Sequence, residues 1–560
     1  MPVFDRLSHR WPTVLASGAA LGALALLWIV RATPLQPAPD VRIDALSAFF
    51  IFALLGGLAL GLLAGPGITP RWRILAQAAP LIAAYLTTLT PVIAGAYLLF
   101  ALLALRPGAR AAPEGPSRAR ALGGALGRAL LAAPYLVAAG ALLVGYGALA
   151  ARGALRYDAR TAGAALDGFA FWFVLLAAVI PASVLGRPTN DPSLLSADYR
   201  RPPADHPLTP SPPHPFIRSI EQDILRIAWL YPLVRLYSLG PWNNGWSFAT
   251  LLLGGAAALW AAAAALARRP ARRELTLLSY LGLALAGMGL GTGAGVAAGC
   301  YGLLAYMILA LRPTTDPGPP FDKLTDRRNE GDRRPTTAES VLPEAADSLP
   351  HHFTPSSLHW LLSGAIPFTA PFVAAWMLVG ASVASGVALL SGAAWLILLL
   401  NGMTATLSSD TAPPDARRPL IVAAAASVVL GVGAPLVVVV LIQPVIEQLQ
   451  GGLTPYGDIN IWPWVGLATI DAAHAPVTTL PSIAVAALML VLSALVYLIA
   501  RLLDTWATLA PAGEADHPMS TVEGAPHRLS GLLARLRDEV PWLGAIEPQA
   551  ADEERRVDGE

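Results

Sequence analysis

Three ionisable residues stand within or beside apolar stretches of this sequence that are long enough to form membrane-spanning helices. Arg226 and Arg235 interrupt the segment 222–240, and Asp167 opens the segment 166–186. A bilayer core cannot solvate charge, so an ionisable group inside it marks an ion or proton path by default. These three residues are therefore the candidates for a residual polar path.

Each candidate also has a plainer interpretation. We favour Arg226 as a cation beside the lipid headgroups, although with Glu221, Asp223 or Arg235 it would anchor a half-channel. Arginine stays charged up to a pH of about 12, so Arg226 cannot release a proton as a lysine does. Asp167 is better explained as an acid at a helix start, where the helix dipole favours it.

The sequence predicts no catalytic, cofactor or metal site. Cys300 is the only cysteine, which excludes an internal disulfide and a cysteine-ligated metal cluster. The run Gly289–Gly295 lacks the preceding strand and the following Lys-Ser/Thr of a phosphate loop, and it predicts a tight turn between helices. The histidines of the polar segments lack metal-ligand spacing, and one more opens a span alone: His206, His214, His351, His352 and His359.

The composition indicates an all-α polytopic membrane protein. Of 560 residues, 55% are hydrophobic and 13% are charged, against about 25% charged in soluble domains. The stretch Leu275–Leu311 contains no Asp, Glu, Lys, Arg or His. A net charge of +1 argues against nucleic acid as a partner and leaves the lipid bilayer.

A membrane-spanning helix needs about 20 apolar residues, and by that measure we expect fourteen spans. The segment 74–105 is divided by Thr90-Pro91 and is predicted to be a short hairpin. The segment 222–240 contains Pro232 and is predicted to cross once or to be a broken or interfacial helix. The spans are 13–30, 44–65, 74–89, 91–105, 129–151, 166–186, 222–240, 245–267, 275–291, 294–311, 358–379, 382–402, 419–442 and 481–503.

Basic loops give the orientation, because loops rich in Lys and Arg stay in the cytoplasm. With the spans above, all basic loops fall on one side: Arg71/Arg73, Arg106–Arg128, Arg187–Arg218, Arg268–Arg273, Arg312–Arg334 and Arg417/Arg418. The opposite side then holds Asp40, Arg42 and Asp44, the Thr292–Gly293 turn and the loop 443–480. We therefore expect an integral protein of a bacterial inner membrane with both termini in the cytoplasm.

Two polar segments, 188–221 and 313–357, separate the groups of transmembrane helices and are predicted to be cytoplasmic linkers. Neither has enough apolar residues to fold alone. One is rich in proline and the other carries charges of both signs. The tail contains an amphipathic stretch, His527–Leu543, that predicts a short surface helix. The expected parts are transmembrane helices 1–187, a Pro-rich linker 188–221, transmembrane helices 222–312, a charged linker 313–357, transmembrane helices 358–503 and a tail 504–560.

Four stretches resemble one family, the antiporter-like, proton-translocating membrane subunits of respiratory complex I, multisubunit Na+/H+ antiporters and membrane-bound hydrogenases. RIDALSAFFIFALL (Arg42–Leu55) is similar to that family's third helix, and Ile180–Pro188 to the end of its broken seventh helix. The run Arg272–Leu311 resembles helices ten and eleven, and SGAIPFTAPFVAAW (Ser363–Trp376) the broken twelfth helix. The resemblance implies an inverted-repeat bundle with broken helices.

The family moves protons along buried Lys, Glu and His residues, and this relay is missing here. The segment 74–105 has no acid where the resemblance implies the glutamate of the fifth helix. Only Arg226 stands where the resemblance implies a basic residue, that of the eighth helix. The other relay positions correspond to apolar, small or aromatic residues: Leu176, Gly302, Tyr306, Ala310 and Ala374 or Ala375.

Three functions follow from these observations. The first is a divergent antiporter-like subunit of a complex I-like, hydrogenase-like or Mrp-like assembly, structural in role and bound to other membrane subunits. Any oxidoreductase activity, such as that of an NADH dehydrogenase-like complex, would then belong to the assembly. The second is active proton or cation translocation along a non-standard polar path. The third, less favoured, is a lipid-linked glycosyltransferase using Asp40 or Asp44.

Overall fold

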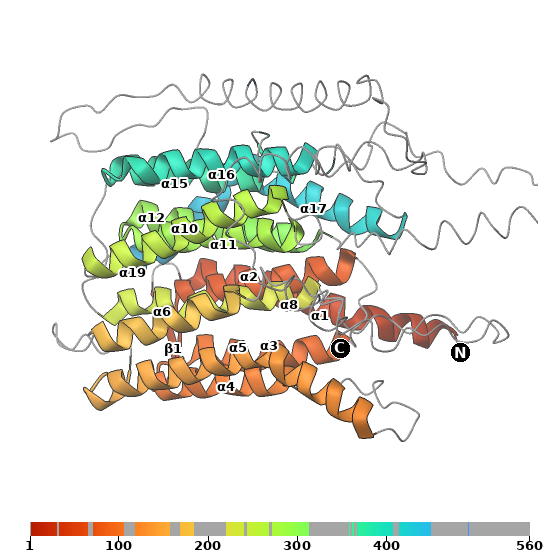
Figure 1. Cartoon of the computed structure of the whole chain (residues 1–560). Coiled ribbons are helices and arrows are strands. Elements are labelled where there is room, and N and C mark those ends of the chain that lie inside the picture. Colours follow the sequence, from red (N-terminus) through yellow and green to blue (C-terminus); the bar gives the residue numbers. More distant parts are fainter. Residues whose placement is uncertain are drawn as a thin grey trace, which may run out of the picture.

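The computed structural model describes residues 2–30, 33–64, 71–105, 118–156, 168–183, 220–239, 244–267, 272–312, 358, 361–362, 366, 368–406, 414–449 and 491. Within these ranges the chain is almost entirely helical, with a two-stranded hairpin at one end of the bundle. Figure 1 shows the helices running side by side, with α3–α5 in the lowest layer and α15 and α16 in the highest described layer. The predicted all-α class is confirmed.

The helices follow the predicted spans. Each predicted span except 481–503, which lies outside the described residues apart from Val491, has a helical counterpart. The bounds are α1 Pro2–Val30, α2 Ala45–Ala64, α3 Arg71–Leu86, α4 Thr90–Leu105, α5 Arg118–Ala151, α6 Gly168–Ser183, α8 Ile220–Leu225, η1 Arg226–Leu230, α9 Tyr231–Arg235, η2 Leu236–Leu239, α10 Asn244–Ala267, α11 Arg272–Gly289, α12 Gly293–Ala310, α15 Ala370–Ala384, α16 Ala388–Thr406, α17 Pro414–Val432, α18 Ala434–Val437, η4 Val438–Ile442 and α19 Gln443–Leu449.

Length and composition identify an integral membrane protein. Four described helices are long and apolar enough to cross a bilayer, namely Ala45–Ala64, Ala133–Ala151, Asn244–Leu266 and Gly293–Ala310. The pair Arg418–Val432 and Ala434–Leu449 meets the same criterion jointly but bends by 77°. The other apolar helices are shorter, which fits a bundle whose helices are interrupted rather than continuous.

Helices α1 and α5 start earlier than the predicted spans 13–30 and 129–151, and three predicted spans nearer the C-terminus also differ from the structure in their boundaries. The segment 358–379 was expected to be one helix, but α15 starts only at Ala370, after Phe368 with a φ of 70° and the N-cap Thr369. The next helix starts at Ala388 instead of 382. The span 419–442 is broken at Gly433 and continues through the π-helical turn η4. Its apolar pattern is continuous across the break, so hydropathy alone could not reveal it.

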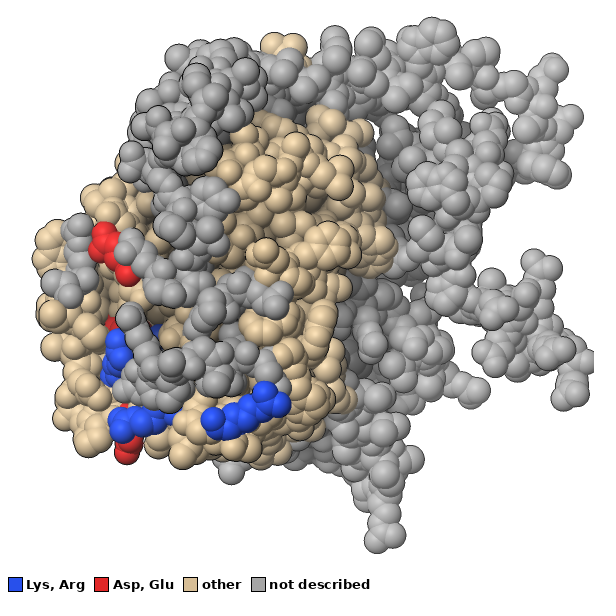
Figure 2. All heavy atoms as spheres, turned by 90° about the vertical axis from the view of Figure 1, so that its left-hand side faces the viewer, with Lys and Arg blue, Asp and Glu red and all other residues tan. Residues whose placement is uncertain are grey.

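The segment 74–105 forms the predicted hairpin. Helices α3 and α4 are joined at Thr87–Leu89, where Val41 pairs with Thr87 and Leu89 pairs with Arg156. The short strands β1 (Leu35–Ala38) and β2 (Val41–Ile43) lie at the same end. Figure 2 shows the end of the bundle at the left of Figure 1, where a few basic and acidic side chains gather on a largely uncharged described surface.

Close contacts between small residues hold the central helices together. A Cβ atom on Gly254 of α10 would lie 2.5 Å from the backbone nitrogen of Ala286 in α11, and one on Gly282 would lie 2.7 Å from the carbonyl oxygen of Gly254. The run Gly289–Gly295 is the predicted tight turn, with a φ of 67° at Gly291 and the Thr292 side chain capping α12. Small residues thus let the backbones of neighbouring helices come close together. Such close packing matters in a membrane, because the hydrophobic effect does not drive helices together in lipid.

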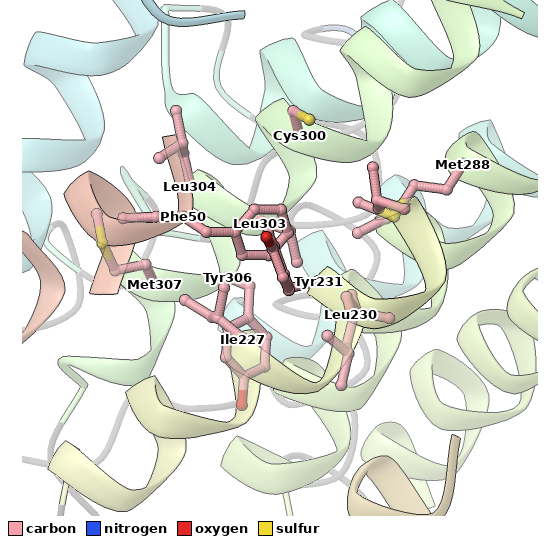
Figure 3. Packing of buried hydrophobic residues seen from close by; sticks show 14 of the residues in the cluster. Phe50, Ile227, Leu230, Tyr231, Met288, Cys300, Leu303, Leu304, Tyr306 and Met307 are labelled. Atoms are coloured by element: carbon pink, nitrogen blue, oxygen red, sulfur yellow. The ribbon is translucent and has the colours of Figure 1, made fainter. Parts of the chain in front are cut away.

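Helices α2 and α12 form the centre of the bundle, because 78% and 94% of the residues in their apolar stretches are buried. Figure 3 shows Ile227, Leu230 and Tyr231 of the segment 220–239 packed near Leu303 and Tyr306 of α12. The broken segment therefore runs through the interior of the protein.

The predicted division into parts stays a prediction. The linkers are outside the described residues, apart from Ile220 and Glu221 of the first, as is the tail with its predicted helix His527–Leu543. The inverted repeat implied by the resemblance also stays a prediction.

Candidate functional site

The segment 220–239 is broken because its sequence cannot sustain a regular α-helix. Pro232 has no N–H to donate to the carbonyl of Ala228, and its ring crowds the preceding turn. The chain responds with the 3₁₀ turns η1 and η2 on either side of the short helix α9. Such turns leave backbone carbonyls in need of donors, which a membrane interior cannot supply.

Tyrosine hydroxyls from neighbouring helices supply several of these donors. Tyr97 of α4 donates to the Ala228 carbonyl, which has no donor at position 232 because of Pro232 and also accepts the backbone N–H of Tyr231. Tyr146 of α5 donates to the Pro232 carbonyl at 3.1 Å, and Tyr306 of α12 donates to the Asp223 carbonyl at 3.0 Å. These hydroxyls are committed to the backbone of the broken segment.

A buried ion pair closes one end of the broken segment. Arg226 is 3% exposed and its guanidinium lies 2.6 Å from the Asp223 carboxylate, which is fully buried. The Arg226 Nε donates to the hydroxyl of Tyr135 at 3.1 Å. The other Asp223 oxygen lies 2.7 Å from Arg273 of α11.

Arg273 extends this cluster to the end of α12. Its Nε donates to the carbonyl of Arg312 at 2.6 Å, and one of its terminal nitrogens donates to the carbonyl of Ala310 at 2.8 Å. The Ala310 carbonyl belongs to the last turn of α12 and Arg312 lies two residues beyond it, at a helix end where an arginine is favoured by the helix dipole. The contacts also bring the start of α11 and the residue Arg312 after α12 together at one end of the bundle.

A second buried ion pair closes the other end. Arg235 is 1% exposed, and its guanidinium donates two hydrogen bonds, of 2.7 and 3.0 Å, to the carboxylate of Asp44. It also donates to Ser47 at 2.9 Å and to Tyr231 at 2.7 and 3.1 Å. Asp44 in turn accepts the Ser47 amide at 2.9 Å and so caps α2. The adjacent Leu46 amide donates to Gln448 of α19 at 3.3 Å.

Asp44, which precedes the span Ala45–Ala64, stays ionised. Burial raises the pKa of Asp44, but the charge of Arg235 and the hydrogen bonds from Arg235, Ser47 and Gln448 outweigh it and lower the pKa to about 2. A carboxylate with this pKa holds no proton at neutral pH. The pair is therefore a fixed pair of charges.

Aromatic side chains occupy the interior between the two ion pairs. The ring of Tyr231 lies 4.5 Å from that of Tyr85 and 5.2 Å from that of Phe50, measured between centroids. Trp229 lies 4.9 Å from Tyr97. Arg226 and Arg235 are nine positions apart, which is about 15 Å of helix, and rings fill this distance.

The structure corrects the interpretation of Arg226. We expected a cation beside the lipid headgroups, but its side chain is buried and paired with Asp223. Arg235 is not a partner of Arg226, since it binds Asp44 at the opposite end of the segment. Asp167 lies outside the described residues, so the predicted path of Arg226, Arg235 and Asp167 is not assembled by the part of the chain that the structure describes.

The relay positions implied by the resemblance are mostly buried and apolar. One of these positions, Leu176, is 46% exposed and faces outward. The others lie in the core: Gly302, Tyr306, Ala310 and Ala374 or Ala375. In the described residues no group of three or more His, Cys, Asp or Glu could hold a metal ion. The arrangement offers fixed charges and hydrogen bonds, and the described part offers no set of metal ligands.

Sequence reasoning missed Asp44 as a buried partner and treated it as an acid of the outer side. A signal was present, because Asp44 stands three residues before Ser47 at the start of an apolar run, the pattern of a helix N-cap. Arg273 was seen only as part of a basic loop. Its contact with Asp223 joins residues 50 positions apart, and no local pattern encodes it.

No protein-family model matches this chain, and no curated protein sequence matches it. Among solved structures, it is similar to a chain of respiratory complex I from Thermus thermophilus with bound NADH, with 14% identity, a TM-score of 0.48 and coverage of 79% of this chain and 98% of that chain. A chain of the Mrp complex from Dietzia sp. matches with 17% identity, a TM-score of 0.49 and coverage of 89% and 90%.

A chain of the membrane-bound sulfane sulfur reductase, an archaeal respiratory membrane complex, matches with 14% identity, a TM-score of 0.48 and coverage of 94% and 96%. At these identities and TM-scores the likenesses say nothing about what this chain transports or binds.

Proposed function

We propose that the chain is a divergent antiporter-like membrane subunit of a complex I-like, hydrogenase-like or Mrp-like ion-translocating assembly, and that its role in this assembly is structural. It sits in a bacterial inner membrane with both termini in the cytoplasm and binds other membrane subunits. Support comes from the four family-like stretches in the family's order and from the broken, buried segment 220–239.

One observation carries the structural role. The buried charges of the broken segment are arginines and aspartates that contact one another, in the triad Arg226–Asp223–Arg273 and in the pair Arg235–Asp44. The chain has a single lysine, Lys323, and it lies in the charged linker. A relay needs groups whose proton occupancy changes at working pH, and arginines do not change theirs.

The aromatic interior supports the same conclusion. A proton path through the segment 220–239 would need hydroxyls or waters free to exchange hydrogen bonds, yet Tyr97, Tyr146 and Tyr306 are bound to backbone carbonyls. The subunit would space its neighbours in the membrane and seal the bilayer between them. Any redox chemistry would belong to other subunits.

The alternative is active proton or cation translocation along a non-standard polar path. It is favoured by the series of polar aromatic residues between the two arginines: Tyr135 accepts from Arg226, and Tyr231 accepts from Arg235 and donates to the Tyr85 carbonyl at 3.3 Å. Such a path would require water between these groups. The two hypotheses differ in whether the isolated chain conducts.

Two measurements test the proposal. Purification of the tagged full chain from its native membrane in mild detergent should recover other membrane subunits, and a chain that migrates alone would argue against a subunit. The reconstituted chain should leave an imposed pH gradient intact in proteoliposomes. Dissipation of the gradient that is lost in Arg226→Ala would establish the translocating alternative instead.

A further inference from the structure

The segment 220–239 crosses the bundle although it is not a regular membrane-spanning helix. Its longest α-helical stretch, α8, has six residues, and α9 has five. One end is fixed by the contact of Asp223 with Arg273, and the other by the contact of Arg235 with Asp44. A segment that is both interrupted and charged is poorly suited to enter lipid on its own.

Protein surrounds this segment on every side. From Asp223 to Leu239 each residue is buried except Ser238, which is half-buried. Helices α2 and α6 pack against it, and tyrosines of α4, α5 and α12 donate to its backbone carbonyls. Most of these helices precede the segment in the chain. The segment therefore depends on helices already in the membrane, because lipid can satisfy neither its backbone nor its charges.

Arg235 is the residue of the segment that is hardest to place. In the predicted orientation the Arg235 end faces away from the cytoplasm, so this side chain must cross the apolar layer after synthesis. An arginine is among the costliest residues at the centre of a bilayer, and arginines favour the cytoplasmic side. The acids within the segment, Glu221 and Asp223, stand near its other end and cannot receive Arg235 there.

Asp44 stands where Arg235 must arrive. The two residues are 191 positions apart, so the helix α2 that Asp44 caps is made well before the segment. The Ser47 amide donates to the Asp44 carboxylate at 2.9 Å and holds it at the N-terminus of α2, where the helix dipole favours an acid. The carboxylate and the Ser47 hydroxyl accept three hydrogen bonds from the Arg235 guanidinium, of 2.7, 3.0 and 2.9 Å. A charge within a membrane protein is tolerated when such partners are in place.

We propose that Asp44 is the counter-charge that draws Arg235 across the bilayer and so fixes the orientation of the segment 220–239. The pair then acts during membrane insertion, in addition to its contribution to the stability of the folded protein. Since this role requires only the chain and a bilayer, it is independent of the assembly proposed above.

The test measures on which side of the membrane the chain emerges after the segment. Cys300 is the only cysteine and is buried, so a membrane-impermeant maleimide should react with a cysteine introduced at Asn244, the exposed first residue of α10. In spheroplasts of a bacterial host, Asn244→Cys in the full chain should be labelled. Adding Asp44→Asn should lower the ratio of labelled to unlabelled chains roughly tenfold, as for the loss of a charge-assisted hydrogen bond. The unlabelled chains should react once detergent opens the membrane.

Removing both charges should restore the orientation. In Arg235→Met with Asp44→Asn no arginine has to cross at this position, so the labelling of Asn244→Cys should return to the wild-type level. A second substitution in the core would not rescue a chain that merely folds poorly. The double variant therefore separates the proposed role of Asp44 from general instability.

Two controls are available at the same end of the bundle. Asp40→Asn also removes an acid, but Asp40 is 58% exposed and 3.4 Å from Arg156, so the labelling of Asn244→Cys should not change. A cysteine at Gln36, which is exposed in β1 and precedes α2, reports the orientation of the preceding span. Gln36→Cys should be labelled equally in all variants.

The proposal is overturned if Asp44→Asn leaves the labelling of Asn244→Cys unchanged, or if the double variant is labelled as poorly as Asp44→Asn alone. An equal fall at Gln36→Cys would also overturn it, because the whole bundle and not the segment would then have lost its orientation. Protection of Asn244→Cys in the wild type would overturn it as well, because Arg235 would then have stayed on the cytoplasmic side.

Discussion

The pair Arg235–Asp44 should show strong energetic coupling. Replacing Arg235 by Met leaves the Asp44 carboxylate, 1% exposed, with the Ser47 amide at 2.9 Å, the Gln448 side chain and the more distant Arg42 guanidinium at 3.9 Å. Breaking a buried pair by removing one partner costs about 3–5 kcal/mol. Asp44→Asn, which retains the N-cap oxygen but strands the charge of Arg235, should cost a similar amount.

The double variant, Arg235→Met with Asp44→Asn, should lose far less free energy of unfolding than the sum of the losses in the two single variants. With both charges gone, no ion remains buried without a partner, and replacing a buried pair by uncharged residues is often close to neutral. We expect a cost of about 1–2 kcal/mol from the lost hydrogen bonds to Ser47 and Tyr231. The coupling energy should therefore exceed about 3 kcal/mol, which is at the upper end of measured values for contacting residues.

The free energy of unfolding can be measured from tryptophan fluorescence as sodium dodecyl sulfate is added to the protein in an uncharged detergent. The matched control is Arg156→Met, whose ion pair with Asp40 is 3.4 Å long and joins side chains that are 34% and 58% exposed, so it should cost at most about 1 kcal/mol. Additive costs for Arg235→Met and Asp44→Asn would refute the reasoning, as would a cost for Arg235→Met no larger than that of the control.

Three further predictions concern the same bundle. The pKa of Asp44 is lowered from 3.8 to about 2 in the folded protein, so the stability that its ionised form contributes is complete above pH 3.8 and is lost as the pH falls towards 2. The free energy of unfolding of the wild type should therefore fall by about 2–3 kcal/mol over this range. An equally steep fall with pH in Asp44→Asn would contradict this. Tyr97→Phe should destabilise by about 1–2 kcal/mol in the same assay, because it removes a donor from the buried Ala228 carbonyl, and an unchanged free energy would show that the carbonyl does not need it. Gly282→Ala should cost about 1–3 kcal/mol, since its Cβ would lie 2.7 Å from a backbone oxygen, whereas Gly140→Ala, with no atom within 4 Å of the added Cβ, should be neutral or stabilising by up to about 1 kcal/mol.

The positions of the helices could be predicted from the sequence because they depend on local composition. Apolar runs of sufficient length, the Thr90-Pro91 division and the Gly-rich turn at 289–295 all appear in the structure where the sequence placed them. The interruption of the segment 220–239 was also predictable, because Pro232 removes a helical donor whatever surrounds it.

The sequence by itself determined that the bundle is apolar, where most of its helices lie and which relay residues are absent. Only the tertiary structure decided where the charges of Arg226, Arg235 and Asp44 reside. Asp44 and Arg235 are 191 positions apart and meet at 2.7 Å, and Arg226 is buried beside Asp223 instead of facing the headgroups. The physical reason is that a charge enters the interior only with a partner, and the partner is supplied by helix packing, which a local pattern does not encode.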